Sequence, residues 1–565
     1  MARTISIGAQ GFEAMREGGY FYVDKTSFVR DWWKGADVVT LVCRPRRFGK
    51  TLNIDTVRCF LSTEFAGRGE ELFGGLEVWE DAEMRALQGP VPVVALSFAQ
   101  VKPPTFEGMM EAVCDIVCAA VDAHGYLRGW EGLTEAERIR LSRVRPGMGQ
   151  VACATALNLL CTLLERYHGG TKPVVLLDEY DAPMERAWVG GYWAEASGFM
   201  RQLMNSTFKT NPAMGRGLIT GVTRVSRESI FSDLNNPEVV TASSRKYRAA
   251  FGFTQDEVDA ALGEYDLAER REDVREWYDG FTFGGVGHVY NPWSVTKFLE
   301  SGGTLAAWWA NTSSNGLISE VLRRSDRRLK ADFEELMRGG AVEKVIDEEV
   351  VFSELRSRPN AVWALLLAAG YVTCPGPVPK DVVHTPRRLA LTNLEVEATF
   401  DRMVEGWFDG VSADYGDLAE ALLSGDAEGA TDSLAEVTLA CMSSFDGAAK
   451  SAEREPERFY HGLVLGLLAS LRGRWSVESN RESGRGRYDV ALVPTDGASG
   501  SDPAVVMEFK VFDRRRERTL EDTVARARTQ IADKRYVAGL VARGIEESRI
   551  RTDGIAFCGK EVLVG

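Results

Sequence analysis

Long apolar runs are absent from this 565-residue sequence, and none reaches the roughly 18 residues that a membrane-spanning helix needs. The N-terminal string MARTISIGAQGFEAM lacks the continuous apolar core of a secretion signal. Only five histidines occur, which argues against chemistry that depends on several of them. The nine cysteines do not form two pairs at metal-site spacing, so thiols are favoured over zinc or disulfides. We therefore expect a cytoplasmic protein with no membrane partner.

Positive charge is also scarce. The net charge is −15, with 67 Lys and Arg against 82 Asp and Glu, which argues against broad coating of nucleic acid. The deficit is uneven, because residues 451–565 carry 20 basic and 18 acidic residues whereas residues 1–450 carry 47 and 64. A near-neutral tail on an acidic body permits a local nucleic-acid site in the tail. The oligomeric state stays open, and an oligomer is compatible with the sequence.

Four short apolar runs, separated by helix-like segments, occupy the first 240 residues. They are residues 38–43, 91–98, 173–180 and 217–222. Such runs fit strands buried on both faces of a parallel sheet, and their alternation with helices predicts an α/β fold. The region that follows has a mostly helical pattern, in which Thr254 and Glu257 have the spacing of a capping box. We predict three domains, over residues 1–240, 241–450 and 451–565.

A basic loop, RPRRFGKTL at residues 44–52, follows the first predicted strand. Gly49, Lys50 and Thr51 match the end of the phosphate-binding pattern G-x-x-x-x-G-K-[ST], but Arg44 holds the first glycine position. A helix pattern comes next and would point its first amides at a phosphate. Lys50 is then expected to reach the β- and γ-phosphates and Thr51 to bind Mg²⁺. The alternative is an ordinary basic loop between a strand and a helix.

The third apolar run leads directly into Asp178 and Glu179. The carboxyl end of a buried strand is where ligands bind in open α/β sheets, so Asp178 is expected to hold Mg²⁺ and Glu179 to polarise the attacking water. The alternative is a strand that ends in surface acids. Arg224, after the fourth run, is expected either to stabilise transferred charge or to form a surface ion pair. The predicted cofactor-binding residues are Arg46, Arg47, Phe48, Gly49, Lys50, Thr51, Leu52 and Arg224.

The tail contains two predicted strands, RYDVALV with Asp489 and AVVMEFKV with Glu508 and Lys510. Side chains alternate along a strand, so Glu508 and Lys510 share a face, and a hairpin would bring Asp489 opposite them. The two carboxylates are expected to bind Mg²⁺ or Mn²⁺, which activates water, while Lys510 positions the water or stabilises phosphate charge. The alternative is a solvent-facing E-x-K ladder. Glu179, Asp489, Glu508 and Lys510 are the predicted catalytic residues.

Several longer strings agree with one family. YFYVDKTSFVRDWW, RPRRFGKTL, LLDEYDAP and TGVTRVSRESIFSDLNN occur in that order, and WYDGFTFG and VYNPWSV follow. In these strings the chain resembles the bacterial AAA-ATPase-like family, whose members commonly carry a C-terminal nuclease-like domain of the PD-(D/E)XK superfamily. The resemblance implies ATP binding, with arginine in place of the first loop glycine. It also implies Glu457 as an extra metal-binding acid and Gln530 as a trailing polar residue of the nuclease-like site.

Two functions are compatible with these patterns. The first is ATP binding and hydrolysis coupled to a metal-dependent nuclease-like domain that acts on nucleic acid. The second is an ATP-dependent conformational switch, whose tail binds a partner or nucleic acid without cutting it. The predicted fold class is α/β, with a P-loop ATPase built on a parallel sheet, a mostly helical middle region and a C-terminal α/β domain of the PD-(D/E)XK type.

Overall fold

The computed structural model describes residues 2–8, 11–224, 237–309, 318, 327–337, 339–348, 361–379, 381, 384–406, 416–445, 460–461, 464, 468, 475–479, 482–484, 486–495, 502–513, 516–559 and 561–565. By their contacts the chain forms two compact units. The first unit comprises residues 1–317 and 341–397, and the second comprises residues 318–340 and 398–565.

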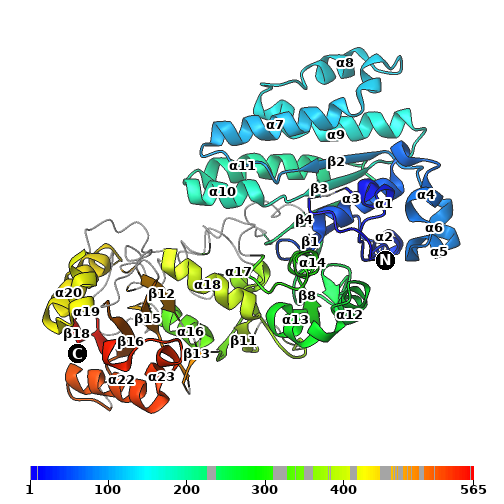
Figure 1. Ribbon diagram of the computed structural model, residues 1–565. Helices are drawn as coiled ribbons and strands as arrows, with labels where there is room; N and C mark the ends of the chain where they lie inside the picture. The colour runs from blue at the N-terminus through cyan, green and yellow to red at the C-terminus, as the bar shows by residue number, and fades with distance from the viewer. Residues whose placement is uncertain are drawn as a thin grey trace. The chain divides into compact units, whose positions relative to one another are not determined.

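A five-stranded sheet organises the first unit, with the order β2-β3-β4-β1-β5. Figure 1 labels the first four of these strands. The strands are β1 (Val39–Cys43), β2 (Val93–Ser97), β3 (Val174–Asp178), β4 (Arg216–Gly221) and β5 (Pro237–Val240). All neighbouring strands are parallel, which confirms the predicted parallel sheet. β1 and β3 are buried along their whole length, as apolar strands covered on both faces should be. Because β1 lies between β4 and β5, its carboxyl end is at a point where the strand order reverses, which favours ligand binding.

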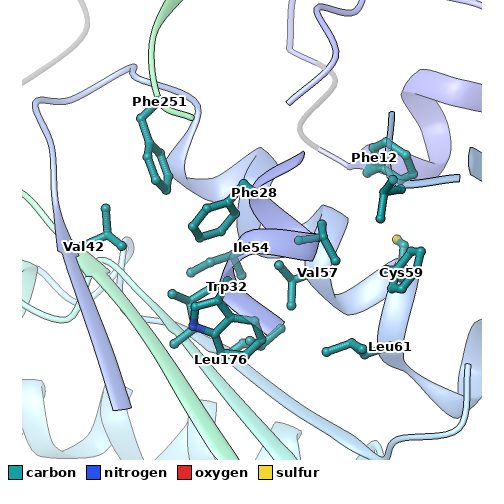
Figure 2. Packing of buried hydrophobic residues seen from close by; sticks show 14 of the residues in the cluster. Phe12, Phe28, Trp32, Val42, Ile54, Val57, Cys59, Leu61, Leu176 and Phe251 are labelled. Carbon is teal, nitrogen blue, oxygen red and sulfur yellow. The ribbon is translucent and has the colours of Figure 1, made fainter. Parts of the chain in front are cut away.

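One face of this sheet is covered by α3 (Lys50–Leu61), which also packs against α1 (Phe12–Glu17) and α2 (Ser27–Lys34). Figure 2 shows Phe28 and Trp32 of α2 beside Ile54 and Val57 of α3, over Leu176 of β3. Each such side chain contributes about 1.5–3 kcal/mol when fully buried. This apolar cluster fixes the direction of α3, and therefore the direction in which its first turn points.

The opposite side of the sheet carries a second group of helices, α7 (Phe106–Asp122), α9 (Gln150–Tyr167) and α11 (Trp193–Met204), which pack on one another (Figure 1). Shorter helices complete this part of the chain: α4 (Gly69–Phe73), α5 (Glu77–Glu80), α6 (Ala82–Ala86), α8 (Glu135–Ser142) and α10 (Ala182–Gly190). The sheet is therefore the middle layer of three.

The remainder of the first unit contains α12 (Gln255–Glu264), α13 (Arg271–Tyr278), α14 (Pro292–Glu300) and α17 (Ala361–Ala369). The predicted capping box begins α12, because Thr254 Oγ1 accepts the Glu257 amide and Glu257 Oε2 accepts the Thr254 amide at 2.7 Å. Two small antiparallel sheets accompany these helices. They are β6 (Phe253–Thr254), β8 (Val286–Tyr290) and β7 (Phe281–Phe283), and β10 (Val372–Thr373), β11 (Arg387–Leu391) and β9 (Val342–Lys344).

The second unit is built on a mixed sheet with the order β12-β15-β16-β17-β18. Its strands are β12 (Trp475–Ser479), β15 (Val490–Pro494), β16 (Ala504–Val511), β17 (Ile550–Cys558) and β18 (Glu561–Val564), and β13 (Glu482–Ser483) pairs separately with β14 (Gly486–Arg487). The helices are α16 (Arg327–Met337), α18 (Leu394–Gly406), α19 (Gly416–Ser424), α20 (Ala427–Phe445), α22 (Leu520–Lys534) and α23 (Tyr536–Val541), of which α18 begins in the first unit. β15 and β16 are antiparallel, as predicted, whereas β16 and β17 are parallel. α22 packs on β16 and β17.

Within the described parts of the chain, no helix has both the length and the apolar character that crossing a bilayer requires. The cytoplasmic location and the domain boundaries at residues 240 and 450 stay predictions.

Candidate functional site

The loop between β1 and α3 has the geometry of a phosphate cradle. Gly49 precedes the first residue of α3 and has a left-handed φ of 74°, which a side chain would strain. Lys50 is only 4% exposed, and its Nζ donates to the carbonyls of Arg44 at 3.0 Å and of Pro45 at 2.8 Å. Burial lowers the pKa of Lys50, while Glu179 and Asp178 oppose that shift. The loop thus curls around its lysine at the amide-rich start of a helix.

The acids at the end of β3 lie against this loop. Thr51 Oγ1 donates to Asp178 Oδ2 at 2.7 Å, and Thr220 Oγ1 of β4 donates to Asp178 Oδ1 at 2.5 Å. Thr51 and Asp178 are 127 residues apart in sequence, so the fold alone brings them together. Glu179 follows with a left-handed φ of 49°. Burial raises the pKa of Glu179, although Lys50 opposes the shift.

A cleft of ≈ 880 Å³ opens beside these groups. Most of the predicted nucleotide-site residues line it, namely Arg46, Arg47, Phe48, Gly49, Lys50, Thr51, Leu52, Asp178 and Glu179. Arg46 Nη2 forms an ion pair with Glu185 at 2.5 Å within the cleft, and the Arg47 guanidinium lies 4.5 Å from the centre of the Trp293 ring. The cleft combines main-chain amides, a lysine, two arginines and acids at one end of the sheet, which suits a polyphosphate with a divalent cation.

A second cluster lies on β15, β16 and α22. The antiparallel register pairs Val490 with Met507, which places Asp489 next to the Glu508 end of β16. Asp489 Oδ2 accepts the amide of Phe509 at 2.7 Å. Glu508 is 1% exposed, and its Oε1 accepts Lys510 Nζ at 2.8 Å.

Gln530 of α22 donates to the same Glu508 oxygen and also to the Tyr536 hydroxyl at 3.2 Å. The structure therefore brings Asp489, Glu508, Lys510 and Gln530 together, and their role in metal binding or catalysis stays a prediction. Two carboxylates beside a lysine suit a hard divalent cation and a phosphate.

Two parts of the chain match models of known protein families. Residues 6–231 match the family model described as "Predicted AAA-ATPase", and residues 455–565 match that of the PD-(D/E)XK nuclease superfamily. The chain is therefore similar to the AAA-ATPase-like family over its first part and to the PD-(D/E)XK nuclease superfamily over its last part. A protein of Azotobacter chroococcum mcd 1 named "Uncharacterized protein in vnfD 5'region" is 28% identical over 405 residues, which cover 71% of this chain and 69% of that protein. No solved structure matches the chain.

Two predicted residues of the ATPase-like domain have surroundings that differ from the rest. Arg224 lines a separate hollow of ≈ 20 Å³ with Cys43 and Pro45, and it is not among the described residues that line the large cleft. Phe48 is fully buried, with its ring 4.7 Å from that of Phe281, so its main contribution is to anchor the loop. The role predicted for Arg224 stays a prediction.

Sequence reasoning missed Asp181 in the same LLDEYDAP string. Asp181 is buried, and its Oδ2 accepts the amides of Val222 and Thr223 at 2.9 and 2.8 Å and the Thr223 hydroxyl at 2.9 Å. It therefore fastens the end of β4 to the end of β3. The sequence shows an acid just after Asp178 and Glu179, but its partners follow the end of β4, 41 and 42 residues further along.

Arg44 stands at the first loop position, where the general pattern has glycine and the resemblance implies arginine. The Arg44 side chain is fully buried, with its guanidinium 4.4 Å from the Phe283 ring centre and Nη1 donating to the Thr241 carbonyl at 2.7 Å. Burial lowers the pKa of Arg44 to about 10. Arg44 thus packs behind the loop rather than into the cleft.

The metal-binding part of the nuclease-like site is incomplete in the described residues. Glu457, the extra acid implied by the family, lies outside them. Within the residues that the structure describes, no three His, Cys, Asp or Glu side chains are grouped as a metal site. Asp489 and Glu508 supply two carboxylates, which fit Mg²⁺ or Mn²⁺ with water completing the coordination.

Proposed function

We propose that the first unit binds ATP with Mg²⁺ and hydrolyses it. The observation that carries the proposal is the contact of Thr51 with Asp178 beside the Lys50 loop, because these two oxygen groups can share one ion. The amides at the start of α3 and Lys50 would bind the phosphates. Bound Mg²⁺ would neutralise charge on the β- and γ-phosphates.

Glu179 is the residue of this site best suited to take a proton from water. It lines the cleft next to Asp178, and its raised pKa makes it a stronger base than an ordinary glutamate. Its carboxylate would orient the attacking water and accept its proton. Asp178, held by two threonines, stays in a fixed orientation and would serve the ion rather than the proton.

The test is phosphate release from ATP by the full-length protein. We expect Glu179→Gln to keep ATP binding and to lower turnover by about 100-fold or more. Lys50→Ala should weaken binding and turnover together, because Lys50 would contact the phosphates. The control is Lys172→Ala, since Lys172 is exposed and donates to the Pro212 carbonyl. Wild-type turnover in Lys50→Ala would refute the proposal.

We further propose that the second unit cleaves nucleic acid with Mg²⁺ or Mn²⁺. Asp489 and Glu508 would hold the ion, which supplies an activated water, and Lys510 would stabilise charge on the scissile phosphate. The proposal is supported by the direct contact of Lys510 with Glu508 on one face of β16. Labelled DNA and RNA, single- and double-stranded, are incubated with the full-length protein, each cation and ATP. Glu508→Gln should abolish cleavage, whereas Glu521→Gln, an exposed control on α22, should not.

A second candidate function is a switch whose tail binds without cutting. It is favoured by the contacts of Glu508 Oε1, which already accepts Lys510 and Gln530 from the protein itself. In that case the full-length protein would bind nucleic acid or a partner in an ATP-dependent way. Glu508→Gln would leave this binding unchanged, and no cleavage would occur with either cation.

A further inference from the structure

α18 carries the chain from the first unit into the second. Residues 394–397 of this helix belong to the first unit and residues 398–406 to the second. Within the second unit, Phe400 is fully buried with its ring centre 4.5 Å from that of Phe333 in α16. The later part of α18 is therefore packed within the second unit. A displacement of the first turn of α18 would reach the second unit because the helix is continuous.

The first turn of α18 is held by one buried acid. Glu395 is 1% exposed, and its Oε2 accepts the Ser294 hydroxyl at 2.7 Å. Its Oε1 accepts the Trp309 amide, also at 2.7 Å. Both oxygens of this buried carboxylate accept hydrogen bonds, and a buried carboxylate oxygen that loses its donor costs free energy. Glu395 therefore keeps its two donors in place.

Ser294 links this acid to the phosphate loop. It lies in the first turn of α14, and the Asn291 side chain caps that turn by accepting the amides of Trp293 at 2.9 Å and Ser294 at 3.4 Å. Asn291 Nδ2 also donates to the Arg46 carbonyl at 3.4 Å. The Arg47 guanidinium, as described above, lies over the Trp293 ring. One helical turn thus touches two adjacent residues of the phosphate loop and the start of α18.

Nucleotide binding would act on this turn directly. Arg46 is paired with Glu185, and a triphosphate in the cleft would compete for that guanidinium and for Arg47. Movement of the Arg47 side chain changes its contact with Trp293, and a shift of the loop backbone at Arg46 changes the contact of its carbonyl with Asn291. Ser294 follows in the same turn. Packed interfaces respond in discrete steps rather than by gradual deformation.

We propose that Glu395 is a positioning residue that conveys the nucleotide state of the phosphate loop, through Ser294 and α18, to the second unit. This inference rests on the proposed ATP binding of the first unit. By reciprocity, a ligand of the second unit that senses α18 would change ATP affinity by the same factor.

Hydrogen exchange of the full-length protein tests the inference, with and without a non-hydrolysable ATP analogue and Mg²⁺. In the wild type the analogue should change exchange in residues 398–406 and in α16. Glu395→Gln should still bind the analogue, but the exchange difference should shrink by about fivefold or more. Ser294→Ala should give the same loss and is the second test where Glu395→Gln lowers stability. Matched controls are Glu300→Gln, a carboxylate paired with Lys297, and Ser301→Ala, whose hydroxyl donates to the Phe298 carbonyl of its own helix.

The outcomes separate the two claims. Analogue binding without any exchange change in residues 398–406 or α16 overturns the coupling and leaves the ATP site standing. A full exchange change in both Glu395→Gln and Ser294→Ala also overturns it. An absence of analogue binding to the wild type overturns the ATP site and, with it, this inference.

Discussion

Asp181 offers a strong test of how the site is held together. Its single Oδ2 atom accepts three hydrogen bonds, from the amides of Val222 and Thr223 and from the Thr223 hydroxyl. Asp181→Ala leaves two main-chain N–H groups at the end of β4 without that acceptor. A buried donor left unsatisfied costs about 1–3 kcal/mol, so the expected loss of stability for two such donors is about 2–6 kcal/mol. Asp181→Asn keeps a carbonyl oxygen there and should lose about half as much.

Urea unfolding read by hydrogen exchange in β4 measures this loss for the first unit alone, since a chain of two units need not unfold in one step. The Asp181→Ala variant should also bind ATP more weakly, because Thr220 at the end of β4 orients Asp178. A loss below about 1 kcal/mol in Asp181→Ala would refute the claim that this acid fastens the two strands. An equal loss in both variants would show that the acceptor oxygen is not what matters.

Two further predictions concern stability. Burial raises the pKa of Asp553 to about 6, against the opposing pull of Arg528 and Arg551, so the protonated acid is favoured in the folded state. Its stabilising contribution is full below the unfolded pKa of about 4 and is lost as the pH rises through about 6. Asp553→Asn should therefore be about 3 kcal/mol more stable than the wild type at pH 8 and no more stable at pH 4. Urea titrations at the two pH values would show this, and equal differences at both would contradict it. Trp32→Ala should lower the free energy of unfolding in urea by about 3–5 kcal/mol, because Trp32 is 1% exposed in the cluster under α3. Trp33→Ala should lower it clearly less, because Trp33 is half-buried. Equal losses in the two variants would count against the packing argument.

Much of the fold can be predicted from local sequence patterns. The four apolar runs became β1 to β4 with boundaries shifted by up to about two residues at most ends, because strands covered on both faces are apolar throughout. The capping box of Thr254 and Glu257 can also be predicted from the sequence, since its partners are three residues apart. The hairpin of β15 and β16 followed from two apolar strands around a Gly- and Pro-rich segment.

Contacts between residues that are far apart in the sequence cannot be predicted in the same way. The strand order places β4 between β3 and β1, so Thr220 donates to Asp178 from a neighbouring strand, a contact that no local pattern predicts. The small sheets around β8 and β11 consist of strands of two to five residues, too short for a periodic signal. No local pattern distinguishes Glu395 from other acids in the first turn of a helix, because its partner Ser294 is 101 residues away.

The most direct test of the central claim is the Mg²⁺ dependence of ATP binding, measured by calorimetry on the full-length protein with Mg²⁺ and with chelator. The account predicts that Mg²⁺ strengthens binding by the wild type and that Asp178→Asn loses most of this gain while keeping Mg²⁺-free binding. If Asp178→Asn gains as much affinity from Mg²⁺ as the wild type, Thr51 and Asp178 do not share the ion and the proposed nucleotide site is wrong.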